Sequence, residues 1–153
     1  MYSQFERFNM KKFKEQVLES LELPKNAFHP LVHIIGNPDI GKDTYIGLFS
    51  EINANKATVK IGKNCDIASF VAINCADSHK LTIGNSSEID RKDIIIEDCV
   101  FIGSHSFIGG YTKIGHHSVI GAGTVLINGG EIPAHSLIVG NPPKIKEGYY
   151  KNK

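Results

Sequence analysis

The sequence predicts an all-β fold in which short parallel strands coil around a three-sided core, preceded by one helix. Three observations support this expectation. An isoleucine or leucine returns at every sixth position from Ile96 to Ile138, glycine follows it at positions 103, 109, 115 and 121, and a small or β-branched residue usually stands four positions after it. Because a six-residue period fits neither a helix nor an alternating strand, each unit is expected to form one side of a triangular coil.

Residues 1–25 are expected to form an amphipathic helix. Apolar residues recur there at mostly helical spacing among lysines and glutamates, namely Phe5, Phe8, Phe13, Val17, Leu18 and Leu21. Pro24 is placed to end the helix. We expect the apolar stripe to pack on the coil stack or on a neighbouring chain.

The β coil is expected over residues 26–143. Earlier units of the pattern begin at Ile40, Ile46, Ile61 and Ile67, and three units, or 18 residues, would close one coil. Roughly four to five coils, stacked about 4.8 Å apart, fit between Ile34 and Val139. The aliphatic and the small residue would both point inward, and glycine would ease the corner because it adopts a positive φ without strain. The polar tail, residues 144–153, is expected to fray.

The period fails in two places. It lengthens to nine residues between Ile52 and Ile61, and it is lost between Ile73 and Ile96. An 18-residue coil has no room for the second interruption, so residues 77–94 are expected to project as a loop, and long loops on rigid scaffolds are usually functional. His79 lies at the start of this loop, and an imidazole can take a proton from an attacking hydroxyl or amine.

Composition argues against several classes of function. The chain carries 17 Lys plus Arg and 16 Asp plus Glu, a formal net charge of +1, so no basic field points to nucleic acid or to an anionic membrane. No apolar stretch approaches the roughly 20 residues that a membrane-spanning helix needs. Three cysteines without close spacing (Cys65, Cys75 and Cys99) indicate reduced thiols and a cytoplasmic protein.

Residues 34–147 resemble the hexapeptide-repeat acyltransferases, in the sugar O- and N-acetyltransferase branch that includes galactoside, maltose and xenobiotic acetyltransferases. The stretches that carry the resemblance are 61–79, 94–104, 119–126 and 137–145, the last of which includes Gly140-Asn141-Pro142. The resemblance implies a left-handed parallel β-helix and acetyl-CoA as co-substrate. It also implies a sugar or nucleotide-sugar acceptor, and a homotrimer with sites between subunits.

The resemblance places the catalytic base at His79. Asp77, two residues earlier, would orient the imidazole or contact the acceptor, or it would only cap a turn. Asn53 and Asn74 would reach an acceptor sugar from a coil edge, although asparagine is also common at corners. These four residues form the expected catalytic and acceptor-binding set.

The acetyl-CoA end is implied by three further positions. Ser104 and Ala122 match positions whose backbone contacts acetyl-CoA, and they are 18 residues apart, so they would stack on one side of successive coils. One of their amides could also stabilise the tetrahedral oxyanion. Lys144 matches a basic position that meets the nucleotide phosphates.

These observations predict an enzyme that moves the acetyl group of acetyl-CoA to a hydroxyl or amine of a sugar by direct attack. One alternative is a nucleotide-activated amino-sugar N-acetyltransferase of bacterial surface polysaccharide biosynthesis. Others are a protein like the γ-class carbonic anhydrases and a non-catalytic β-helix assembly protein. We expect no metal site, because the chain lacks the pair of histidines five apart that γ-class enzymes use. The stacked His117 and His135 would instead form a hydrogen-bonding ladder or an interface.

Overall fold

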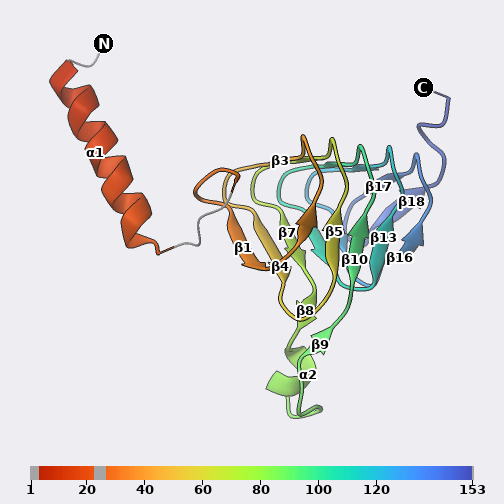
Figure 1. Cartoon of the computed structure of the whole chain (residues 1–153). Coiled ribbons are helices and arrows are strands. Elements are labelled where there is room, and N and C mark those ends of the chain that lie inside the picture. Colours follow the sequence, from red (N-terminus) through yellow and green to blue (C-terminus); the bar gives the residue numbers. More distant parts are fainter. Residues whose placement is uncertain (1–3, 23–26, 153) are drawn as a thin grey trace.

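The computed structural model describes residues 4–22 and 27–152. From β1 to β17 the chain winds as a left-handed parallel β-helix, in which three sheets form the three sides of the coil (Figure 1). The predicted all-β fold is therefore confirmed.

Each side of the coil is one sheet. The first sheet holds β1 (His33–Gly36), β4 (Glu51–Ala54), β7 (Ala72–Asn74), β12 (Phe107–Gly109) and β15 (Val125–Leu126). The second holds β2 (Asp39–Ile40), β5 (Val59–Ile61), β10 (Ile94–Ile96), β13 (Thr112–Ile114) and β16 (Gly130–Ile132). The third holds β3 (Tyr45–Ile46), β6 (Asp66–Ile67), β11 (Phe101–Ile102), β14 (Val119–Ile120), β17 (Leu137–Val139) and β18 (Lys144–Lys146).

The coils stack in one register throughout. Along the first sheet Ile52 pairs with Ile73, Ile73 with Ile108, and Ile108 with Leu126. These partners are 21, 35 and 18 positions apart in the sequence. The two failures of the six-residue period are therefore insertions that leave the ladder of inward residues intact.

The core is the inward ladder itself. Its isoleucines are almost fully buried, and the small residues at the corners are buried with them (Ser50, Ser106, Thr112, Ser118, Thr124 and Ser136), as predicted. Most of their hydroxyls bond across coils: Ser50 Oγ donates to the carbonyl of Ala68 at 3.0 Å and accepts the N–H of Val71 at 3.2 Å. Serine suits these corners because its hydroxyl finds a backbone partner where a larger side chain would not fit.

The expected reason for the glycines is wrong. Positive φ falls on the third residue after the inward one, which is usually not glycine, as at His105 and His117. At Gly103 and Gly115 φ is not positive. A Cβ there would instead lie 2.5 and 2.3 Å from the backbone nitrogens of Ala122 and Ala134 in the next coil. Glycine is required because successive coils approach too closely for any side chain.

The N-terminal segment is helical, as predicted, with α1 at Gln4–Ser20. Phe13, Val17 and Leu21 are exposed by 61%, 39% and 46%, so this stripe does not pack on the coil stack (Figure 1). The side chains of Phe5 and Phe8, and the whole of Pro24, lie outside the described residues. No helix in the described ranges is long and apolar enough to cross a membrane.

The C-terminal tail does not fray where it begins. β18 folds back antiparallel on β17, with Ile145 opposite Ile138 and Lys144 opposite Val139. The turn between them contains Gly140, whose φ of +94° favours glycine. The expectation of fraying is wrong for residues 144–146, because unpaired groups on the last strand of the third sheet accept a further strand.

We predict that Ile114→Ala lowers the free energy of unfolding by about 2–5 kcal/mol, because it leaves a cavity in the ladder. Ile114 is fully buried between its partners Ile96 and Ile132. Chemical denaturation measures the loss. The outward Lys113→Ala is the matched control and should cost less than about 1 kcal/mol; equal losses would contradict an inward ladder.

Candidate active site

The second insertion lies between β7 and β10 and leaves the coil stack as a small structure of its own. β8 (Ala76–Asp77) pairs antiparallel with β9 (Asp90–Arg91), and the short helical turn α2 (His79–Thr82) follows β8 directly (Figure 1). The N–H of Lys92 bonds the carbonyl of Cys75 at 2.9 Å and ties the returning chain to the outgoing one. The rigid coil below therefore fixes the position of His79, the first residue of α2.

His79 and Asp77 form a hydrogen-bonded pair. Nδ1 of His79 lies 2.5 Å from Oδ1 of Asp77, and the same oxygen accepts the backbone N–H of His79 at 3.0 Å. The backbone N–H of His79, followed by its side chain, holds the pKa of Asp77 below its usual range. Because Nδ1 faces the carboxylate, Nε2 is the nitrogen left to exchange a proton with a substrate.

A second charged pair lies beside the first. Asp77 and Asp90 stand opposite each other in the β8–β9 ladder, and two like charges in this position repel. Nζ of Lys80 lies 2.7 Å from Oδ2 of Asp90, and this contact lowers the pKa of Asp90 and raises that of Lys80. The consecutive residues His79 and Lys80 thus each contact one of the facing carboxylates, which orients the first turn of α2.

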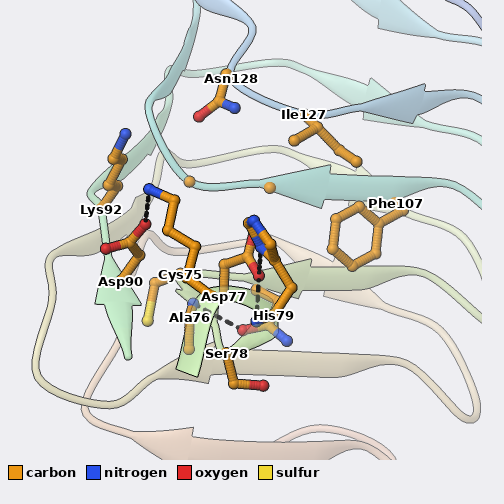
Figure 2. Close-up of a pocket in the computed structure, with 14 residues that line it drawn as sticks. Cys75, Ala76, Asp77, Ser78, His79, Asp90, Lys92, Phe107, Ile127 and Asn128 are labelled. Atoms are coloured by element: carbon orange, nitrogen blue, oxygen red, sulfur yellow. Dashed lines mark hydrogen bonds and ion pairs between the residues drawn. The ribbon is translucent and has the colours of Figure 1, made fainter. Parts of the chain in front are cut away.

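The pair borders a pocket of about 450 Å³ between the insertion and the outer surface of the first sheet (Figure 2). Asp77, His79 and Lys92 line it from the insertion, and Phe107 and Ile127 line it from the coil stack. Gly109 and Gly110 also line it. Gly110 has no room for a side chain, since a Cβ there would lie 2.8 Å from the carbonyl oxygen of Lys92.

The two predicted asparagines have different positions relative to this pocket. Asn53 and Asn74 are partners in adjacent strands of the first sheet. The Oδ1 of each accepts a backbone N–H two residues on, from Asn55 at 3.0 Å and from Ala76 at 2.9 Å. Both therefore shape the turn that leaves the strand, and of the two it is Asn74 that lines the pocket.

The residues predicted for acetyl-CoA lie elsewhere. Ser104 and Ala122 follow β11 and β14, so they occupy the corner between the third and first sheets in successive coils. The carbonyl of Ser104 accepts the N–H of Gly123 at 2.9 Å. Lys144 is exposed on β18. Within one chain the structure brings His79, Asp77 and Asn74 together at one pocket. Ser104, Ala122 and Lys144 lie outside that pocket.

Phe107 and Ile127 are pocket residues that sequence reasoning missed. Ile127 had a signal: it occupies the position next to the inward residue that is glycine at 103, 109, 115 and 121. Its Cα lies 3.5 Å from where a Cβ of Gly109 would be. β15 is the last strand of the first sheet, so no further coil covers Ile127.

The pocket also borders a thiol. Cys75 is buried, and burial raises its pKa. Its Sγ lies 3.6 Å from the carbonyl oxygen of Asn55, to which it donates. A buried, protonated thiol is a poor nucleophile, so the geometry does not favour a covalent intermediate on this residue.

The histidines at the other corners form ring stacks. His117 lies on His135 with ring centroids 5.3 Å apart, and His116 meets both edge-on at 5.1 Å. Loss of hydration and the nearby His116, His117 and Lys151 lower the pKa of His135. Within residues 4–22 and 27–152, no three His, Cys, Asp or Glu side chains are arranged to hold a metal ion.

The chain was compared with known proteins. Neither a family model nor a curated protein matches it. Galactoside acetyltransferase in complex with coenzyme A is 26% identical over 97% of this chain and 73% of its own, with a TM-score of 0.68. The polySia-specific acetyltransferase NeuO is 30% identical over 76% of this chain, with a TM-score of 0.62. A hexapeptide-repeat-containing acetyltransferase from Vibrio cholerae is 26% identical over 77% of this chain, with a TM-score of 0.61.

This chain spans only 57% of NeuO and 62% of the Vibrio cholerae protein. The three matched proteins are all acetyltransferases. They fit the family that the sequence resembles, the hexapeptide-repeat acetyltransferases, and the chain has the β-helix of that family.

We predict that the Asp77 carboxyl titrates below its usual range and that His79→Ala moves its pKa part of the way back. The shift is only partial because the backbone N–H of residue 79 still donates to Asp77 in the variant. A depressed pKa also means that this contact stabilises the fold above the usual carboxyl pKa and is lost as the pH falls through the lower value. Carboxyl NMR titration measures the pKa of Asp77 in the unaltered protein and in the variant.

The control is Lys80→Met, which should raise the pKa of Asp90 and change that of Asp77 little, because Lys80 is only a minor influence on Asp77. An Asp77 carboxyl that titrates in the usual range in the unaltered protein would contradict the observed pair.

Proposed function

We propose that the protein transfers the acetyl group of acetyl-CoA to a hydroxyl or amine of a sugar. The observation that carries the proposal is the Asp77–His79 pair at the edge of a 450 Å³ pocket on a hexapeptide-repeat scaffold. The pair supplies a base with its orienting carboxylate, and the pocket supplies room for an acceptor. The structural neighbours include acetyltransferases, one of them in complex with coenzyme A.

His79 acts as the general base in this reaction. Nε2 takes the proton of the acceptor hydroxyl or amine while that oxygen or nitrogen bonds to the thioester carbonyl carbon. The carbon–sulfur bond then breaks, and the imidazolium returns the proton to the leaving thiolate of coenzyme A. Asp77 stabilises the imidazolium, since its low pKa keeps it ionised throughout.

Acetyl-CoA is the donor, and Ser104, Ala122 and Lys144 are its proposed contacts. The first two offer backbone groups at one corner of successive coils, which suits an extended pantetheine arm. Lys144 lies on the exposed β18 together with Lys146, so two ammonium groups are placed near one end of the stack for the phosphates. Because Cys75 is a poor nucleophile, the acetyl group passes directly from donor to acceptor.

The positions of these residues support sites shared between subunits. His79 stands at the corner between the first and second sheets, and Ser104 and Ala122 stand at the corner between the third and first. These corners are the opposite edges of one sheet, about 10 Å apart for strands of three residues. The side chains of His79 and Asp77 are also more than half exposed in the single chain. A homotrimer would bring the base of one subunit to the donor corner of the next.

The acceptor is a sugar or a nucleotide sugar, and the free thiols favour the cytoplasm. A panel of sugars, amino-sugars and nucleotide-activated amino-sugars separates the proposed activity from the alternative of a nucleotide-activated amino-sugar N-acetyltransferase. The readout is release of coenzyme A.

We predict that His79→Ala reduces kcat by roughly 10²–10⁴-fold on any acceptor that the unaltered enzyme acetylates, because the general base is lost. The variant should still bind acetyl-CoA, and isothermal titration calorimetry measures this binding. His33→Ala is the matched control, since His33 lies in β1 outside the pocket and pairs with Glu51 at 3.7 Å. Near-normal turnover by the His79 variant would remove His79 from its role.

We predict that light scattering finds a trimer and that two inactive variants complement each other. His79→Ala removes the base, and Ala122→Trp obstructs the donor corner. In mixed trimers some interfaces pair an intact His79 with an intact donor corner, so co-expression should restore part of the activity. A monomer, or mixed trimers no more active than the single variants, would contradict shared sites.

A further inference from the structure

Two large apolar side chains lie open in the candidate pocket. Phe107 is half-buried and Ile127 is 57% exposed, and both line the pocket that His79 borders. Exposing apolar side chains to water costs free energy, and a ligand that covers them removes this cost. Their presence beside the base indicates an apolar surface on the ligand.

Phe107 and Ile127 together form an apolar surface in the pocket, which we call the shelf. Phe107 points outward from β12, between Ala72 and Val125 of the adjacent strands. A Cβ on Gly109 would lie 3.3 Å from Cε1 of the Phe107 ring and 3.5 Å from Cα of Ile127. The bare glycine thus keeps the space between the two apolar groups open.

The opposite side of the pocket is polar. Figure 2 shows Phe107 and Ile127 on one side, Asp90 and Lys92 on the other, and His79 between them. Nζ of Lys92 lies 5.6 Å from the ring centroid of Tyr111. The pocket therefore has one apolar and one hydrogen-bonding wall, with the proton acceptor at their junction.

A pyranose ring has the same two-sided character. Its C–H groups form an apolar face that packs on an aromatic ring, while its hydroxyl or amino groups project from the rim. We propose, on the basis of the acetyltransferase function above, that Phe107 and Ile127 form the platform for the C–H face of a pyranoside acceptor. The platform holds one rim hydroxyl or amine at Nε2 of His79 and directs the others toward Asp90 and Lys92.

The platform makes the enzyme selective for ring-shaped acceptors. An acyclic alcohol or amine can reach His79 but cannot cover the shelf, so it gains little from Phe107. The pantetheine arm of the donor is also apolar, but the charged wall opposite the shelf matches the rim of a sugar better than it matches a thioester arm.

Steady-state kinetics with a pyranoside acceptor that the enzyme acetylates test the platform. Phe107→Ala should raise the KM for the acceptor roughly tenfold and leave the KM for acetyl-CoA unchanged, since aromatic packing contributes about that factor. Phe107→Trp should keep the acceptor KM near normal. Tyr45→Ala, which removes a side chain that is 59% exposed on β3 and outside the pocket, is the control. A higher KM for acetyl-CoA alone, or no change in either KM, would overturn the proposal.

Ligand NMR separates this proposal from the acetyltransferase function on which it rests. Saturation-transfer spectra are recorded for methyl β-pyranosides of glucose, galactose and N-acetylglucosamine with His79→Ala, which retains the shelf but not the base. The expected result is saturation concentrated on the C–H protons of one ring face, lost in His79→Ala/Phe107→Ala. Even saturation or none would overturn the platform. Face-selective binding without turnover by the unaltered protein would support the platform and refute the transferase.

Discussion

The close approach of successive coils is the constraint on which this structure depends. At Gly103 and Gly115 the backbone of the next coil occupies the place where a side chain would begin. The same approach brings the inward isoleucines into unbroken ladders and lets corner hydroxyls bond the carbonyls of the next coil. Side chains inside the coil therefore have almost no freedom to vary, whereas those on its outer surface are hardly restricted.

This division explains how an insertion can carry a site without disturbing the fold. The chain leaves the first sheet after Asn74 and enters the second sheet at Ile94, which pairs with Val59 as though nothing intervened. The ladder holds both ends of the insertion, so the short β8–β9 pair starts from fixed points. Asp77 and His79 inherit that rigidity although their own side chains are largely exposed.

Inward positions were predictable from the sequence because the stack imposes a period on them. Ile114 and Ser118 follow from spacing alone, and so does the place where the chain must leave the coil, next to His79. Outward positions repeat no pattern, so nothing in the sequence joined Phe107 to His79 across the pocket. The pairing of β18 with β17 was missed for a related reason, since the polar residues around Ile145 read as a tail and the open edge of the third sheet is visible only in three dimensions.

The end of the first sheet at β15 has a consequence for how such a protein can evolve. Ile127 stands at the position that is glycine at 103, 109, 115 and 121, and no strand of the first sheet follows β15 to cover it. Duplicating one more 18-residue turn at this point would press a backbone against Ile127 and close off that part of the hollow. Deleting a turn would remove the side chain altogether. The number of turns, a quantity usually associated with length and stability, therefore also sets the shape of the ligand cavity.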